Sequence, residues 1–120
     1  MKVLIIAAHG SRKKESNIEV EKLADRLARK VDGRFDKVIH AFLQMADPLL
    51  ETSLTQCVKN GATHVVIFPF FIGSGSHILE DIPSLVEKAQ QANPHVEFKL
   101  TRHLGSIEAI EAVIINEVTS

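Results

Sequence analysis

Residues 68–83 read Phe-Pro-Phe-Phe-Ile-Gly-Ser-Gly-Ser-His-Ile-Leu-Glu-Asp-Ile-Pro. The start of this stretch completes an apolar run over Thr63–Phe71, which is typical of a strand buried on both faces of a parallel sheet. The loop Gly73-Ser74-Gly75-Ser76 follows, and its two glycines leave the backbone free to turn. His77 comes directly after the loop. The stretch therefore predicts a strand with a histidine just beyond its carboxyl end, where open α/β sheets bind ligands.

Apolar runs of strand length occur at three other places, and strands are predicted at Val3–Ala8, Lys37–Leu43 and Val96–Leu100. The last of these alternates apolar and polar residues, which is typical of a sheet edge. Each strand is followed by a segment whose apolar residues recur at helical spacing. The order along the chain is therefore a strand and a helix, repeated four times.

Short polar or proline signals mark the expected starts of the helices: Ser16 with Glu19 as a capping box, Asp47 before Pro48, Asp81 after a short helical turn at Ser76–Glu80, and Ser106. Gly33 and Gly61 are the expected ends of the first two helices, and the third is expected to end near Ala92. Pro83 would then lie in the first turn of the third helix, where its missing N–H has no intrahelical partner.

Right-handed crossovers turn this order into a three-layer α/β sandwich with a four-stranded parallel sheet. The strand order 2-1-3-4 is the natural doubly wound solution, and its switch point lies between the first and third strands. His9 and His77 follow those two strands, so the topology brings two imidazoles to one crevice. Both histidines are candidate metal ligands and catalytic residues.

Composition limits the classes of protein to which the chain could belong. Its 120 residues, 45% of them apolar, fit one domain over residues 1–120. The net charge of −1 does not indicate a nucleic-acid-binding protein. The single cysteine, Cys57, fits a helical core position and a reducing compartment. The apolar start turns polar at His9, too early for a signal peptide or a membrane span, so a cytoplasmic location is expected.

The remaining histidines are weaker candidates for function. His40 lies inside a predicted strand and is expected to pack there, while His64 and His95 lie at the amino ends of strands and are expected on the surface. His103 follows the fourth strand on the active side and is an accessory candidate. The loop Gly73–Ser76 could also bind anions through its amides, although it carries no nucleotide-binding signature.

Four motifs occur in order along almost the whole chain: Ala8-His9-Gly10-Ser11-Arg12, Phe42-Leu43 followed by Asp47-Pro48, Pro69-Phe70-Phe71-Ile72, and Gly75-Ser76-His77 followed by Asp81-Ile82-Pro83. Together they resemble the small CbiX-type sirohydrochlorin chelatases, which belong to the class II tetrapyrrole chelatases. The resemblance implies a flavodoxin-like chelatase fold and a homodimer. It also implies insertion of a divalent metal into a sirohydrochlorin-type tetrapyrrole without ATP, as in cobalamin or sirohaem biosynthesis, and no organic cofactor.

The resemblance assigns roles to individual residues. His9 and His77 fall on the two family histidines, with metal binding as their implied role, and imidazole suits Co²⁺, Ni²⁺ and Fe²⁺. Co²⁺ is the first expectation for the metal, which is a substrate of the reaction. The acidic side chains of the tetrapyrrole are expected to meet donors on the two loops: Ser11, Arg12, Gln44, Gly73, Ser74, Gly75 and Ser76.

Gln44 departs from the family pattern, in which many members carry a glutamate at this position. An amide orients a ligand by hydrogen bonds but takes no proton, so Glu80 or Asp81 could supply the missing carboxylate as accessory residues. Two other classes of function stay open from the sequence. One is a metal or tetrapyrrole carrier without catalysis, and the other is a phosphate- or nucleotide-binding module that uses the Gly/Ser loop.

Overall fold

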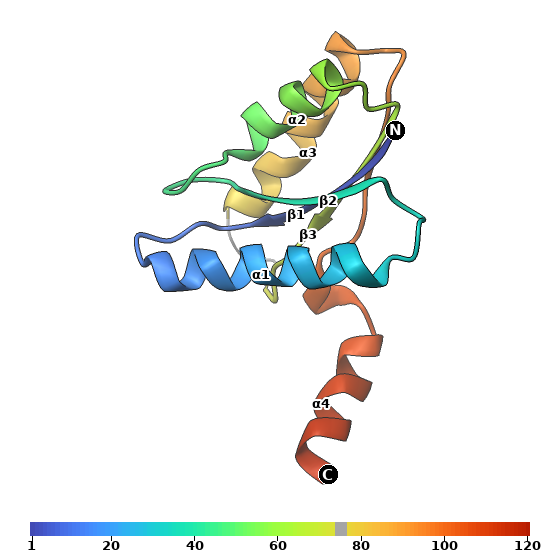
Figure 1. Ribbon diagram of the computed structural model, residues 1–120. Helices are drawn as coiled ribbons and strands as arrows, with labels where there is room; N and C mark the ends of the chain where they lie inside the picture. The colour runs from blue at the N-terminus through green and yellow to red at the C-terminus, as the bar shows by residue number, and fades with distance from the viewer. Residues whose placement is uncertain (74–76) are drawn as a thin grey trace.

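The computed structural model describes residues 1–73 and 77–120, except for the side chains of residues 77–79. Strands and helices alternate through most of this part of the chain (Figure 1). In chain order they are β1 (Lys2–Ala8), α1 (Lys14–Lys30), β2 (Lys37–Phe42), α2 (Leu50–Lys59), β3 (His64–Pro69), α3 (His77–Ala92), β4 (Glu97–Leu100), the 3₁₀ helix η1 (Leu104–Ser106) and α4 (Ala109–Thr119).

The four strands form one parallel sheet in the order β2-β1-β3-β4, which confirms the predicted fold class and topology. Ala7, near the end of β1, pairs with Ala41 in β2 and with Pro69 in β3. The strands β2, β1 and β3 therefore end side by side. The loops that follow β1, β2 and β3 leave the sheet at this common carboxyl edge.

Two apolar cores hold the layers together, because alternate residues of each strand point to opposite faces of the sheet. On one face, Ile5 and Ile67 pack with Leu50 of α2 and Ile82 of α3. On the other face, Ile6, Ala8 and Phe42 pack with Val20 and Ala24 of α1. Figure 1 shows α1 on one side of the sheet and α2 and α3 on the other.

The first two predicted helix starts are wrong. α1 begins at Lys14, and the amide of Ser16 already donates to the Lys13 carbonyl at 3.2 Å, so Ser16 lies inside the helix. α2 begins at Leu50. The amide of Phe42 in β2 donates to the carbonyl of Pro48 at 2.8 Å, which holds the Asp47–Pro48 segment beside the strand. The Asp47–Pro48 peptide bond is cis.

The third predicted helix start is also wrong, because α3 is continuous from His77 and Asp81 lies within it. Pro83 consequently lies beyond the first turn, where a proline costs about 3 kcal/mol of helix stability. Ile82 and Val86, which are 1% and 8% exposed, pack on the sheet from the same helix and offset this cost. Ser76, in the predicted preceding turn, lies outside the described residues.

The fourth predicted helix start is wrong as well. Ser106 belongs to η1 and donates its hydroxyl to the carbonyl of His103 at 2.8 Å, while α4 begins only at Ala109. Figure 1 shows α4 projecting from the body of the molecule instead of covering the sheet. No helix among the described residues combines the length and apolar character that crossing a membrane requires.

Candidate functional site

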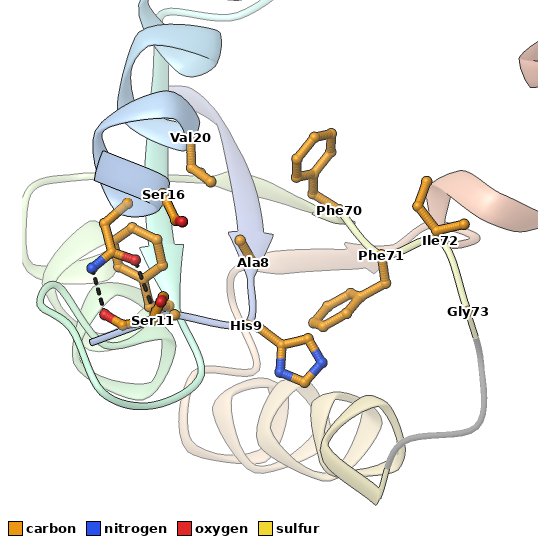
Figure 2. Close-up of a pocket in the computed structure, with 12 residues that line it drawn as sticks. Ala8, His9, Ser11, Ser16, Val20, Phe70, Phe71, Ile72 and Gly73 are labelled. Atoms are coloured by element: carbon orange, nitrogen blue, oxygen red, sulfur yellow. Dashed lines mark hydrogen bonds between the residues drawn. The ribbon is translucent and has the colours of Figure 1, made fainter. Parts of the chain in front are cut away.

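His9 stands at the carboxyl end of β1, where the sequence predicts it. Its side chain is exposed, and its imidazole packs edge-on against the ring of Phe71, with ring centroids 4.7 Å apart and an interplanar angle of 70°. Phe71 itself is only 5% exposed, so it provides a fixed wall for the imidazole. In Figure 2 the imidazole points toward the first turns of α3. The histidine is thus oriented by packing on a buried aromatic ring.

Gly10 allows the loop after β2 to approach the histidine loop. Its φ is +89°, and a Cβ there would lie 1.8 Å from the carbonyl oxygen of Gln44. The amide of Gln44 donates to the carbonyl of His9 at 3.2 Å, and the amide of Leu43 donates to the carbonyl of Ala8 at 3.0 Å. Two backbone bonds and a glycine therefore hold the backbone of Gln44 next to that of His9.

Asn17 holds the Ser11 end of the loop, a role that its position in the sequence does not indicate. Its Oδ1 accepts from the amide of Ser11 at 3.0 Å, and its Nδ2 donates to the carbonyl of Ser11 at 2.7 Å (Figure 2). The hydroxyl of Ser11 accepts from the amide of Lys13 at 3.0 Å. Ser11 is therefore a fixed turn residue, and the first turn of α1 supports the site loop.

Replacing Asn17 with alanine should lower the free energy of unfolding by about 1–2 kcal/mol, because a partly buried amide and carbonyl of Ser11 each lose their partner. Urea denaturation measures this change. Asn60→Ala is the matched control, since it removes only an exposed bond of 3.3 Å to Gln56 and should cost less than about 0.5 kcal/mol. Equal effects at the two positions would show that Asn17 does not hold the loop.

The predicted site residues border two neighbouring hollows at this edge. The larger, about 430 Å³, is lined by His9, Ser11 and Gly73 together with aromatic and small residues: Ala8, Gly10, Ser16, Asn17, Val20, Phe42, Phe70, Phe71 and Ile72 (Figure 2). The other, about 310 Å³, is lined by Gln44 and Asp81 with Leu43, Ser84, Leu85 and Lys88. The amide of Gln44 and the carboxylate of Asp81 thus line a different hollow from the one that contains His9.

The other predicted site residues lie in simpler surroundings. Arg12 and Glu80 are exposed. The side chain of His77 and the residues Ser74, Gly75 and Ser76 fall outside the described part of the chain. Within the described part, no three histidine, cysteine or acidic side chains come together as a metal-binding group. The backbone places the start of α3 at His77, in the segment that follows β3, the strand beside β1.

The positions of His40, His64 and His95 are as expected, whereas the accessory role predicted for His103 stays a prediction. His40 is half-buried in β2 and packs edge-on against Phe42 with ring centroids 5.5 Å apart. His64 and His95 are exposed at the opposite end of the sheet, and His64 Nε2 lies 3.1 Å from a carboxylate oxygen of Glu97. His103 is half-buried beside η1, where its carbonyl accepts the hydrogen bond from Ser106.

Cys57 is buried on α2, as its helical spacing predicts. Burial raises the pKa of its thiol, and the nearby charge of Lys37 opposes that rise only in part. The thiol therefore stays protonated near neutral pH and packs as a small apolar group.

Comparison of the sequence with known proteins places it among chelatase relatives. The chain is 34% identical over 102 residues to the chloroplastic sirohydrochlorin ferrochelatase of Arabidopsis thaliana, covering 85% of this chain and 44% of that protein. It is 28% identical over 121 residues to the sirohydrochlorin cobaltochelatase of Saccharolobus islandicus strain L.S.2.15, covering 96% and 91%. The chain thus spans less than half the length of the plant ferrochelatase and most of the archaeal protein.

Two solved structures share the fold. A CbiX protein of cobalamin biosynthesis from Marinobacter aquaeolei VT8 superposes with a TM-score of 0.81 at 23% identity, covering 98% of this chain and 94% of that one. The sirohydrochlorin chelatase SirB from Bacillus subtilis subspecies spizizenii, in complex with cobalt, gives a TM-score of 0.79 at 24% identity. The match covers 98% of this chain and 49% of the SirB chain. The CbiX family model matches residues 3–120. The chain therefore belongs to the CbiX family.

Proposed function

We propose that this chain inserts a divalent metal ion into a sirohydrochlorin-type tetrapyrrole. The single observation that carries the proposal is the exposed imidazole of His9 at the common carboxyl edge of the sheet, next to the strand that leads to His77. Relatives named sirohydrochlorin ferrochelatase and sirohydrochlorin cobaltochelatase support the reaction class. Co²⁺ is the metal that we propose first, with Ni²⁺ and Fe²⁺ as the alternatives that imidazole ligands also suit.

In the proposed mechanism, His9 and His77 bind the metal through neutral imidazole nitrogens and leave coordination positions open. Pyrrole nitrogens of the tetrapyrrole fill these positions as the metal passes to the macrocycle. Two pyrrole N–H protons must leave for each divalent ion that enters, so the charges balance. An imidazole that has released the metal is a suitable acceptor for such a proton.

The tetrapyrrole is expected to lie across the two loops at this edge. Arg12, Lys13 and Lys14 are exposed beside the hollow and offer charge-assisted hydrogen bonds to carboxylates of the substrate. The hollow itself has walls from Phe42, Phe70 and Phe71 and suits the apolar faces of a macrocycle. Because this edge is open to solvent, we propose that the site is completed in a homodimer whose two crevices face a shared cavity.

Anaerobic incubation with sirohydrochlorin and each of the three metals, followed by absorbance, tests the proposal. An enzyme metallates many tetrapyrroles per chain, whereas a carrier binds metal or tetrapyrrole in proportion to the protein and then stops. A phosphate- or nucleotide-binding module would instead bind phosphate or flavin at the Gly/Ser loop and would be unaffected by His77→Ala. These outcomes separate the three classes that the sequence leaves open.

Gln44→Glu should leave folding intact and hold or raise the metallation rate. The side chain of Gln44 is exposed, and Gln44 contacts Gly10 through its backbone oxygen. A change of the side chain should therefore disturb neither the core nor this contact. A carboxylate could in addition accept a proton or attract the metal ion. The rate of absorbance change measures the effect, with Gln91→Glu on the exposed surface of α3 as the matched control for added charge. Loss of turnover with metal binding retained would refute the proposed role of this position.

A further inference from the structure

Exposed apolar side chains gather at the end of the molecule that carries His9. Outside α4, the large apolar side chains that are exposed among the described residues are Ile18 44%, Met45 56%, Leu49 37% and Ile72 68%. They belong to the start of α1, to the segment between β2 and α2, and to the residues just after β3. All three segments lie at the carboxyl edge of the sheet. A single exposed apolar residue needs no explanation, but such a gathering beside a site indicates a contact surface.

Met45 keeps its exposed position at a cost in backbone conformation. Its φ is +66°, in the left-handed region that glycine and asparagine adopt most easily. The backbone on either side is held in place, because the amide of Gln44 donates to the carbonyl of His9 at 3.2 Å and the amide of Phe42 donates to the carbonyl of Pro48 at 2.8 Å. The methionine side chain itself is 56% exposed and adds little to the core. It is therefore available for a ligand.

Ile72 combines a fixed backbone with an exposed side chain in the same way. A Cβ on Gly105 would lie 1.7 Å from the carbonyl oxygen of Ile72, and the amide of Gly105 donates to the carbonyl of Phe71 at 2.9 Å. The side chain of Ile72 is nevertheless 68% exposed, and it lines the hollow that contains His9 (Figure 2). A side chain on a fixed backbone loses little conformational freedom when a ligand binds.

The strand order places these two residues on either side of His9. The strands β2 and β3 flank β1 in the sheet, so the loop of Met45 leaves on one side of the histidine and Ile72 follows the strand on the other side. Two inter-strand spacings, about 10 Å in all, separate β2 from β3. A flat macrocycle that lies over His9 can therefore contact both loops at once.

We propose that Met45 and Ile72 hold the apolar face of the tetrapyrrole over His9. This inference rests on the proposed function for its ligand and adds two substrate-contact residues to it. The surroundings match a ligand with apolar faces and acidic edges, because the exposed basic residues 12–14 lie on the loop that leads from His9 into α1. The unbranched, flexible side chain of methionine also suits contact with an irregular apolar surface.

The backbone conformation of Met45 allows its side chain to be tested without loss of the fold. Asparagine tolerates a positive φ better than other residues that carry a Cβ, so Met45→Asn should leave the midpoint of urea denaturation unchanged or raise it. A methionine with only a structural role would behave in the opposite way, since its replacement would lower the midpoint and leave ligand binding unchanged. Stability and binding therefore distinguish the two roles.

Binding of metal-free sirohydrochlorin, followed by the fluorescence of the tetrapyrrole with no metal added, tests the proposal. Met45→Asn and Ile72→Asn should each weaken binding about tenfold, because each removes one large apolar contact. Met45→Leu keeps the apolar surface and should bind within about twofold of the unaltered chain. Asp32→Asn is the matched control, because Asp32 also has a positive φ, +54°, but follows the far end of α1, so binding should not change.

The outcomes separate this inference from the proposed reaction. Equal binding of sirohydrochlorin by Met45→Asn and the unaltered chain would overturn the inference, whether or not the chain inserts metal. Unchanged binding with altered sedimentation of the free protein would mean that Met45 contacts a second copy of the chain, and this would overturn it too. Absence of binding by the unaltered chain would do the same. Binding that depends on Met45 without any metal insertion would support the inference and refute the proposed reaction alone.

Discussion

Replacing His9 with alanine should lower the rate of metal insertion at least about a hundredfold, while the free energy of unfolding changes by less than about 1 kcal/mol. The imidazole is exposed and packs on one face of Phe71, so its loss leaves no cavity in the core. The loss of one nitrogen ligand from an open site should weaken divalent-metal binding strongly. Calorimetric titration with Co²⁺ and the metallation rate measure the two effects, and denaturation measures stability.

Three comparisons sharpen this test. His95→Ala removes an exposed histidine at the opposite end of the sheet and should change neither metal binding nor rate. Combining His9→Ala with His77→Ala should cost less than the sum of the single effects, because two ligands of one ion act together. Metal binding by the unaltered chain should weaken as the pH falls, since only neutral imidazole ligates. A folded His9→Ala variant with unchanged affinity and turnover would refute the assignment.

Gly10→Ala should lower the free energy of unfolding by about 3 kcal/mol or more, because two costs add. The φ of +89° is unfavourable for any residue with a Cβ, and the new Cβ would lie 1.8 Å from the Gln44 carbonyl oxygen. The loops of His9 and Gln44 would have to separate, so the metallation rate should fall as well. Chemical denaturation and the absorbance assay measure the two changes.

Gly33→Ala separates the two costs. Gly33 has a φ of +78°, and no heavy atom lies within 4 Å of the place that a Cβ would occupy, so only the backbone cost of about 1 kcal/mol applies. The metallation rate should not change, because Gly33 lies at the far end of α1 from His9. Equal destabilisation by the two substitutions would show that the close approach of Gly10 to Gln44 does not contribute.

The sheet could be predicted from the sequence because its strands are short apolar runs and parallel crossovers have one hand. The helix starts could not, because Ser16, Asp47 and Ser106 carry good local capping signals, and at Asp47 and Ser106 longer-range contacts override those signals. The amide of Phe42 pairs with Pro48, for example, and this bond extends the segment where the local signal predicts a helix. The anchoring of η1 to Phe71 likewise decides where α4 begins.

The position of His9 could be predicted because it follows directly from the strand order. The supporting residues could not, because their roles depend on contacts that no spacing reports. The sequence pattern predicts only that Phe71 ends a strand and that Asn17 is a polar residue of an amphipathic helix. The exposure of α4 was also unexpected, since Ile110, Val113 and Ile114 have the spacing of a helix that packs on its own sheet.

The rate of metal insertion into sirohydrochlorin, measured anaerobically with the tetrapyrrole in large excess over the chain, tests the central claim most directly. The account predicts many turnovers per chain with at least one of Co²⁺, Ni²⁺ and Fe²⁺, well above the rate in buffer, and loss of this acceleration in His9→Ala. Insertion no faster than in buffer with all three metals would contradict the account.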